Sequence, residues 1–320
     1  MRTDLHIIAS CTDRKRARVP PELHLRALHE KEPERRARHW WRNLWEHPHP
    51  TQPARELYAG DHWRVVEELP TLAAQARFQP RLWVVSAGYG LIPADAPIRP
   101  YSATFARGHE DSVVARTDAR RPHALLRQWW RALASEPGPA PGEPRLLQEL
   151  ARSTPHARLL VVASPAYIAA FEEDLRLAAS ALHRPEHLLI ISTPVAASRR
   201  ELAPHWVPSN ARLQTKFGGA LSSLHARIAR DLLVRARSQG SGMDAASVQD
   251  YYGRLIHRSA PRARFERTPM TDDEVLQFIA RESRTEKPSC SALLRRLRDG
   301  GHACEQQRFR RLFHQLQERP

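Results

Sequence analysis

Short apolar runs alternate with amphipathic segments along the first 240 residues of the chain. Four of these runs are rich in Val, Ile and Leu and are bounded by turn residues, a pattern typical of buried strands. They are residues 5–9, 82–85, 158–163 and 187–193. The segments between and after them repeat apolar residues at helical spacing, as in 124–134 and 220–237. Strands that alternate with helices predict an α/β fold with a mostly parallel sheet flanked by helices.

The pattern changes after residue 237. Residues 238–242 read Ser-Gln-Gly-Ser-Gly, a composition typical of a flexible linker, and we place the linker at 238–250. Before it, residues 1–237 form the predicted α/β domain, to which we assign any catalysis. After it, residues 251–320 form a predicted small all-helical domain with helices near 271–280, 289–298 and 304–317.

The last predicted helix follows a Gly-Gly turn and carries arginines beside an apolar stripe. A helix, a glycine turn and a basic helix together resemble a helix-turn-helix DNA-binding motif. The alternative is a helical bundle that serves only as a lid or a packing element. Thr271 and Glu274 have the spacing of a capping box, which predicts where the first of these helices begins.

The net charge of +15 favours a nucleic-acid partner, here double-stranded DNA. Nearly all of the basic residues are arginine, which also suggests a GC-rich genome, but codon bias does not explain the excess of charge itself. The arginines that we expect to contact DNA are Arg14, Arg55, Arg295, Arg308, Arg310 and Arg311.

Other features narrow the class of protein. Three cysteines without zinc-ligand spacing give neither a disulfide framework nor a metal site. The chain has no Walker loop, and no dinucleotide fingerprint follows its first strand, so we expect no cofactor. Without a signal segment or an apolar run of ~20 residues, we expect a soluble cytoplasmic protein with no membrane partner and no obligate protein partner.

Polar residues follow three of the predicted strands where each one ends. Because ligands of open α/β sheets bind outside the carboxyl ends of the strands, these residues and the tyrosines near them form the predicted substrate pocket. A lysine is notable in so arginine-rich a chain, because it supplies a compact charge or an amine nucleophile. The predicted substrate-binding residues are Ser10, Cys11, Asp13, Lys15, Tyr58, Ser86, Tyr89, Gly90, Tyr101, Ser164, Tyr167 and Lys216.

Two aspartates are the candidate catalytic carboxylates. Asp61 stands at the start of a predicted helix, so it is either a helix cap or a catalytic group. Asp95 lies on a proline-stiffened segment after the second long apolar run. Either carboxylate could activate water or stabilise the cationic sugar that forms when a glycosidic bond breaks.

Two further segments allow more than one interpretation. Residues 35–45 mix four arginines with Trp40, Trp41 and Trp45, which could stack nucleobases or form an ordinary helix face packed on the core. Residues 106–121 are charged and predict a surface excursion.

Three short motifs in the first third of the chain resemble one known family. Ser-Ala-Gly-Tyr-Gly-Leu at 86–91 with Ile-Arg-Pro-Tyr at 98–101, Pro-Ala-Arg-Glu-Leu-Tyr-Ala-Gly at 53–60 and Ser-Cys-Thr-Asp-Arg-Lys at 10–15 are similar to blocks of the YaaA-like superfamily. That group includes DNA-binding proteins and proteins of modified-base metabolism. In architecture the chain looks like the anti-phage DNA glycosylases that excise glucosylated hydroxymethylcytosine.

The resemblance implies a DNA glycosylase that leaves abasic sites in phage DNA. A pocket of tyrosine hydroxyls and carboxylates would suit a base flipped out of the duplex. If Lys15 or Lys216 were the nucleophile, the enzyme would also cut the strand through a Schiff base. The alternatives are a non-catalytic DNA-binding protein and an enzyme that converts or transfers a deazaguanine-type base.

Overall fold

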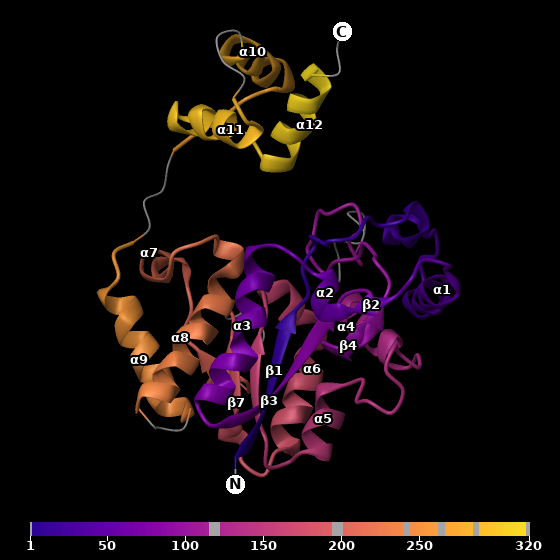
Figure 1. Cartoon of the computed structure of the whole chain (residues 1–320), viewed down its shortest axis with the longest axis vertical. Coiled ribbons are helices and arrows are strands. Elements are labelled where there is room, and N and C mark those ends of the chain that lie inside the picture. Colours follow the sequence, from indigo (N-terminus) through magenta and orange to yellow (C-terminus); the bar gives the residue numbers. More distant parts are fainter. Residues whose placement is uncertain are drawn as a thin grey trace. The chain divides into compact units, whose positions relative to one another are not determined.

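The computed structural model describes residues 2–114, 122–193, 201–239, 243–261, 266–283 and 288–317. The chain divides into two compact units, residues 1–260 and 261–320 (Figure 1). Within the described ranges, every helix is too short or too polar to cross a lipid bilayer.

A six-stranded sheet in the order β4-β3-β1-β6-β7-β8 forms the centre of the first unit. All neighbouring strands are parallel except β4, which runs antiparallel to β3. The predicted α/β fold is therefore confirmed. The strands are β1 (Thr3–Ser10), β3 (Phe78–Ser86), β4 (Gly90–Pro93), β6 (Arg158–Val162), β7 (Leu188–Ile191) and β8 (Trp206–Val207).

Helices pack in two groups beside this sheet. The first group is α3 (Asp61–Gln75) and α8 (Leu224–Gln239), which contact each other along their lengths (Figure 1). The second group is α1 (Pro33–Glu46), α4 (Pro122–Ala134), α5 (Leu147–Ser153) and α6 (Pro165–Ala181). Helix α3 connects β1 to β3, and α6 connects β6 to β7, and these two connections run in opposite directions across the sheet. Because such crossovers are right-handed, α3 and α6 lie on opposite faces of the sheet.

The boundary between the two units lies further along the chain than predicted. Helix α8 continues to Gln239, and α9 (Ala245–Arg258) begins where we expected linker. The α9 helix belongs to the first unit, since the buried Tyr252 donates its hydroxyl to Asp231 Oδ2 on α8 at 2.8 Å. A glycine-rich composition predicted a long linker, but residues 240–242 lie outside the described residues and tertiary packing fixes the segment after them.

Helix α8 also begins later than the predicted start at residue 220. A short helix, α7 (Gln214–Phe217), and a 3-10 turn (Leu221–Ser223) precede it. Gly218 and Gly219 between them have φ of 67° and 71°, which ends α7 in a left-handed conformation. The glycine pair is thus a helix stop, and α8 itself begins only at Leu224.

Small strands and a short helix complete the first unit. Strands β2 (Gln52–Pro53) and β5 (Pro97–Ile98) pair antiparallel, and α2 (Ala54–Leu57) follows β2. The predicted surface excursion at 106–121 is wrong for its middle part, because Asp111 and the residues after it to Val114 are buried. Hydrogen bonds from Ser102 and Arg26 to the Asp111 carboxylate hold this segment against the rest of the first unit. Residues 115–121 lie outside the described residues.

The second unit is a small helical domain, as predicted. It contains α10 (Asp272–Glu282), α11 (Cys290–Asp299) and α12 (Gln306–Gln317), with a two-residue parallel pair of β9 (Thr268–Pro269) and β10 (His302–Ala303). Val275, Leu293 and Phe309 lie in its core. The capping box predicted at the start of α10 forms, since Thr271 Oγ1 accepts from the N–H of Glu274 and the Glu274 carboxylate accepts from the N–H of Thr271.

The stability of the first unit should depend on pH through His6 on β1. Its Nδ1 accepts a hydrogen bond from Trp83 Nε1 at 3.0 Å, and its Nε2 lies 2.9 Å from Thr154 Oγ1. Burial in this site lowers the pKa of His6 to about 4. Because the folded-state pKa lies below the unfolded value of about 6.5, the contribution is complete above pH 6.5 and is lost as the pH falls to 4. We expect a loss of about 3 kcal/mol at most.

Urea unfolding at pH 7 and pH 4.5 measures this loss. The variant His6→Gln keeps a donor and an acceptor but does not titrate, so its free energy of unfolding should fall less over the same pH interval. An equal fall in both proteins would show that His6 does not cause the loss.

Candidate functional site

The parallel strands of the sheet end together at one edge, where the predicted pocket residues follow them. Register places Ser10 of β1 beside Val85 of β3, and Ala9 beside Val162 of β6. From β1 the chain crosses to β3 on one side, while from β6 it crosses to β7 on the other. The topological switch point therefore lies between β1 and β6, the place where open α/β sheets form a ligand crevice.

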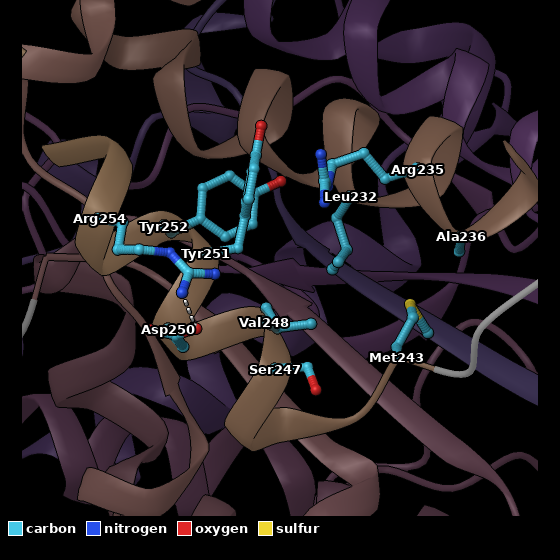
Figure 2. A pocket seen from close by; sticks show the side chains of 10 residues that line it. All are labelled: Leu232, Arg235, Ala236, Met243, Ser247, Val248, Asp250, Tyr251, Tyr252 and Arg254. Atoms are coloured by element: carbon cyan, nitrogen blue, oxygen red, sulfur yellow. Dashed lines mark ion pairs between the residues drawn. The ribbon is translucent and has the colours of Figure 1, made fainter. Parts of the chain in front are cut away.

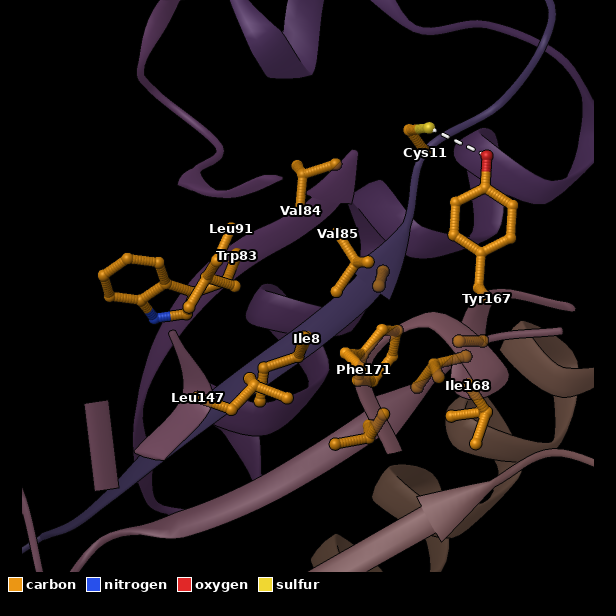
Figure 3. Close-up of a cluster of buried hydrophobic side chains, with 14 of the residues drawn as sticks. Ile8, Cys11, Trp83, Val84, Val85, Leu91, Leu147, Tyr167, Ile168 and Phe171 are labelled. Atoms are coloured by element: carbon orange, nitrogen blue, oxygen red, sulfur yellow. Dashed lines mark hydrogen bonds between the residues drawn. The ribbon is translucent and has the colours of Figure 1, made fainter. Parts of the chain in front are cut away.

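Cys11 and Tyr167 meet across this switch point. Cys11 directly follows β1, and Tyr167 lies in the first turn of α6, directly after β6. Their Sγ and hydroxyl atoms are 3.2 Å apart in a buried hydrogen bond (Figure 3). The Tyr167 ring packs edge-on against Phe105 at 5.0 Å. Two residues predicted from separate strand ends, 156 positions apart, thus share one site.

Four buried tyrosines, which we call the tyrosine cluster, surround the same edge. They are Tyr58, Tyr89, Tyr101 and Tyr167. The Tyr101 hydroxyl hydrogen bonds to the Tyr58 hydroxyl at 2.9 Å and to Ser86 Oγ at 2.6 Å. Burial raises the pKa of each cluster hydroxyl above its usual value, so all four are neutral at physiological pH. The cluster therefore offers neutral hydrogen-bond donors and acceptors in an apolar surrounding.

The turn after β3 is held in place by bonds to three successive carbonyl groups. Trp129 Nε1 donates to the carbonyl of Ala87 and Trp40 Nε1 donates to that of Gly88, both at 2.8 Å. The buried guanidinium of Arg145 donates to the carbonyl of Tyr89 at 2.7 Å. Ser86 Oγ accepts hydrogen bonds from the backbone N–H groups of Gly88 and Tyr89. These bonds make the Gly-Tyr-Gly segment a rigid wall for the tyrosine cluster.

Lys15 places an amine against this cluster. Its Nζ lies 4.6 Å from the centre of the Tyr101 ring, and its backbone bridges to Tyr58. Although the residue is partly exposed, Nζ itself is buried and forms no hydrogen bond with any described residue. Burial lowers the pKa of Lys15, while its electrostatic interactions with Cys11, Asp13 and Asp111 oppose that change. An unpaired amine with a lowered pKa is a strong candidate for a functional group.

Asp111 is a buried carboxylate that the sequence analysis did not identify. It accepts hydrogen bonds from Ser102 Oγ at 2.7 Å and from the N–H of Arg26 at 3.0 Å, and His24 Nδ1 lies 3.0 Å away. Burial opposes ionisation, but these hydrogen bonds together hold its pKa below the usual value. It lies in the segment 106–121, whose charged residues predicted a surface position, although Ser112, Val113 and Val114 directly after it are uncharged.

Asp61 joins α3 to α8 and to the turn before α8. Its carboxylate accepts from Ser223 Oγ at 2.6 Å, from Arg227 Nη2 at 2.8 Å and from Arg64 Nη2 at 2.6 Å. The bonds from Ser223 and Arg227 hold its pKa well below the usual range. It begins α3 but makes no side-chain cap bond. The structure therefore gives this residue a role that neither prediction anticipated, an ion pair between α3 and α8.

Asp95 is placed away from the carboxyl ends of the strands by the β3–β4 hairpin. Pro93 pairs with Trp83, and the N–H of Ala94 donates to the carbonyl of Leu82, four residues before Ser86. Four residues of strand correspond to ~13 Å. The exposed Asp95 carboxylate forms an ion pair with Arg55. Arg55 is one of the arginines predicted to contact DNA, and this ion pair neutralises its charge. Among the described residues, no hydrogen bond or ion pair joins Asp61 or Asp95 to Lys15 or the tyrosine cluster.

The remaining predicted residues divide between the site and the surface. Ser10 is buried, and its carbonyl accepts from Nε2 of His62, whose Nδ1 is buried without a partner among the described residues. Gly90 starts β4 with φ of 75°. Asp13, Arg14 and Ser164 are exposed or partly exposed at the same edge. Lys216 is exposed on α7 and has no contact with the cluster, so it does not share the site with Lys15.

The predicted DNA contacts of the second unit are on its surface. Arg295 on α11 and Arg310 on α12 are exposed. Arg308 and Arg311 form ion pairs with Asp272 at 2.5 and 3.7 Å. Asp272 thus neutralises part of the positive charge of Arg308 and Arg311. Of the four arginines predicted to contact DNA in the second unit, Arg295 and Arg310 remain available to bind phosphates.

Three of the cavities in the described part of the chain are lined by residues other than Lys15, and only one of these three reaches the tyrosine cluster, through Tyr89. One of about 260 Å³ separates α8 from α9, where the Arg235 guanidinium lies 3.4 Å over the Tyr251 ring (Figure 2). Another of about 570 Å³ is lined by Arg55 and Asp95. The third, of about 230 Å³, lies beside α1 and is bounded by Trp41, Trp45 and Tyr89. None of them contains Lys15.

Comparison with family models, with curated proteins and with solved structures found no match to this chain.

Proposed function

We propose that the protein is a DNA glycosylase that excises a modified base, and that Lys15 supplies the reacting amine. The observation that carries the proposal is the Lys15 Nζ, buried without a hydrogen-bond partner among the described residues, beside the Tyr101 ring at the switch point of the sheet. A buried unpaired amine is costly to folding, so its presence calls for a role other than stability.

The chemistry of an amine with a lowered pKa suits cleavage of an N-glycosidic bond. The neutral Nζ attacks C1′ of the flipped nucleotide, and the bond to the base breaks as the base leaves with the electron pair and takes up a proton. The new C1′–N bond opens the sugar ring to a Schiff base, which water hydrolyses to an abasic site or which eliminates the 3′ phosphate. Each of these steps needs only water as a further reactant.

The tyrosine cluster supports recognition of a base in the same site. Its four neutral hydroxyls can donate to or accept from the polar edge of a base, and their rings can pack on its face. Lys15 stands on the irregular segment between β1 and the first 3-10 turn. A flipped nucleotide would have to displace this segment, because Nζ is covered in the structure.

The substrate class comes from charge and from the motif resemblance. A net charge of +15 favours DNA. The three motifs similar to the YaaA-like superfamily include Ser10 to Lys15, Tyr58, Ser86 and Tyr101, the residues that meet in this site. Through the glycosylases that the chain resembles in architecture, they support a glucosylated cytosine of phage DNA as the excised base.

The decisive experiment incubates the protein with phage DNA that carries glucosylated hydroxymethylcytosine and with unmodified DNA of the same length. Mass spectrometry would detect released base, and alkaline treatment would reveal abasic sites. We expect both only with the modified DNA. Tight binding without base release from either DNA would refute the glycosylase and favour a non-catalytic binding protein. Exchange of a free deazaguanine-type base into nucleic acid would instead favour base conversion.

Borohydride in the same reaction tests the amine. Reduction of a Schiff base would leave a protein–DNA adduct stable to denaturation, and peptide mapping should place it at Lys15. Base release without an adduct would keep the glycosylase but exclude Lys15 as nucleophile.

A further inference from the structure

One helix face in the first unit ends in an exposed tryptophan beside a cavity. Trp45, near the end of α1, is 59% exposed, whereas the other seven tryptophans are buried. Burial of a tryptophan removes a large apolar area from water, so an exposed one at the mouth of a cavity indicates a binding surface. The tryptophans of this segment are predicted either to pack on the core or to stack bases, and the structure divides them: Trp40 and Trp41 are buried and Trp45 is not.

The cavity beside Trp45 has walls suited to a flat aromatic ring. Trp41 and Trp45 stack with ring centres 5.8 Å apart and planes at 25°, and Tyr89 meets Trp41 edge-on at 6.3 Å. Pro97, Arg99 and Thr51 also line it, together with Leu44 and Pro139. Its volume of about 230 Å³ is below the ~300–1,000 Å³ of pockets for drug-sized ligands, which favours a single ring system.

Arg99 fixes the geometry of this cavity and adds positive charge to its wall. Its guanidinium donates to the carbonyl of Leu44 at 3.0 Å and to that of His49 at 2.8 Å. These bonds tie the last turn of α1 to the segment after it, and a cation is favourable at a helix carboxyl end. The cavity is therefore preorganised.

A row of arginines leads along α1 to Trp45. Arg35, Arg38 and Arg42 are exposed and, with Trp45, follow the spacing of one helix face. Arg35 pairs with Glu32 at 3.2 Å. Arg38 and Arg42 form no ion pair with any described residue, although Glu46 follows Trp45 at the end of the helix. A basic row beside an aromatic platform is how proteins bind single-stranded nucleic acid, with phosphates on the cations and a base on the ring.

We propose that the face of α1 formed by Arg38, Arg42 and Trp45, which we call the α1 platform, binds single-stranded DNA and stacks an unpaired base on Trp45. A proline-rich peptide could also contact aromatic residues, but the uncompensated arginines favour an anionic chain. Tyr89 connects the platform to the tyrosine cluster, since it packs edge-on against both Trp41 and Tyr101. The inference shares with the proposed function only DNA as ligand, and it does not require base release.

Binding of a fluorescent single-stranded oligothymidylate tests the platform. We expect Trp45→Ala to weaken binding at least ~5-fold and Trp45→Phe to restore most of it, because loss of one stacked base has that effect in single-strand binding proteins. Trp45 is exposed, so its truncation should leave the melting temperature unchanged. An equal affinity of Trp45→Ala and the wild type would overturn the proposal.

The salt dependence of binding tests the arginines. The double variant R38Q/R42Q should reduce the slope of log Kd against log salt by about 1.4, since each single-strand phosphate contact contributes about 0.7. The matched control R152Q/R184Q removes the same charge from two other exposed arginines. Arg152 lies in α5, and Arg184 lies in the loop before β7. Equal slopes for the two double variants would contradict the platform, as would quenching of tryptophan fluorescence by a polyproline peptide but not by the oligonucleotide. Base release is measured separately on duplex DNA, so failure of one proposal is distinguishable from failure of the other.

Discussion

Replacement of Lys15 by methionine is expected to abolish base release while the fold becomes no less stable. Methionine matches the lysine side chain as far as Cε and keeps an apolar contact with the Tyr101 ring, but it has no amine. Because the substitution removes a buried amine that has no hydrogen-bond partner among the described residues, the free energy of unfolding should stay equal or rise. The rate of base release should fall by at least about 10²-fold, the lower end of the effect of a positioned catalytic group. Single-turnover assays and urea unfolding measure the two quantities.

Two control variants separate the possible roles of Lys15. Lys216→Met changes an exposed lysine outside the site and should leave base release unchanged. Lys15→Arg keeps a positive charge but cannot supply a neutral amine, because the guanidinium remains protonated. Activity in Lys15→Arg would therefore show that Lys15 acts as a charge and not as a nucleophile.

The pH dependence of base release tests independently which protonation state of Lys15 reacts. Only the neutral amine attacks, so single-turnover base release by the wild type should increase as the pH rises through the pKa of Lys15. Since burial lowers that pKa, the increase should occur below the range of an ordinary lysine. A rate that falls over this interval would point to the ammonium form.

Gly88→Ala is expected to have the second largest effect, on both stability and activity. A methyl group at this position would lie 2.4 and 2.5 Å from ring atoms of Tyr101. The backbone cannot move aside easily, because Trp129, Trp40 and Arg145 hold the carbonyls of the turn. The ring must shift instead, which would weaken its hydrogen bonds to Ser86 and Tyr58. Overpacking of this kind costs about 1–3 kcal/mol.

The displaced Tyr101 ring should also reduce base release, by about 10²-fold, because a misplacement of about 1 Å has that effect on an oriented reaction. Gly253→Ala is the matched control. Gly253 lies within α9, and no heavy atom stands within 4 Å of the added methyl group. That variant should be more stable by about 0.5–1 kcal/mol and fully active. A Gly88→Ala protein as stable as the wild type would show that the backbone of the turn can shift to accommodate the methyl group.

The arrangement of the site explains why some predictions from the sequence were confirmed and others were not. Cys11, Ser86 and Tyr167 come from the ends of different strands, and the parallel sheet brings the ends of such strands to one edge. Tyr58 and Tyr101 were found through motif resemblance, and their mutual hydrogen bond places them there. Asp61 and Asp95 were chosen as carboxylates at a predicted helix start and on the segment after a predicted strand, and both form ion pairs with arginines.

Local pattern alone predicted four of the six strands of the main sheet, its mostly parallel order and the helical second unit, because apolar periodicity and turn residues act over a few positions. Only the tertiary structure decided which polar groups are buried and paired. It left the Lys15 amine without a partner among the described residues, buried Asp111 within a charged segment and exposed Trp45 beside two buried tryptophans. It also joined α9 to the first unit across a glycine-rich stretch. Burial and pairing depend on residues distant in sequence, and composition near a residue does not contain that information.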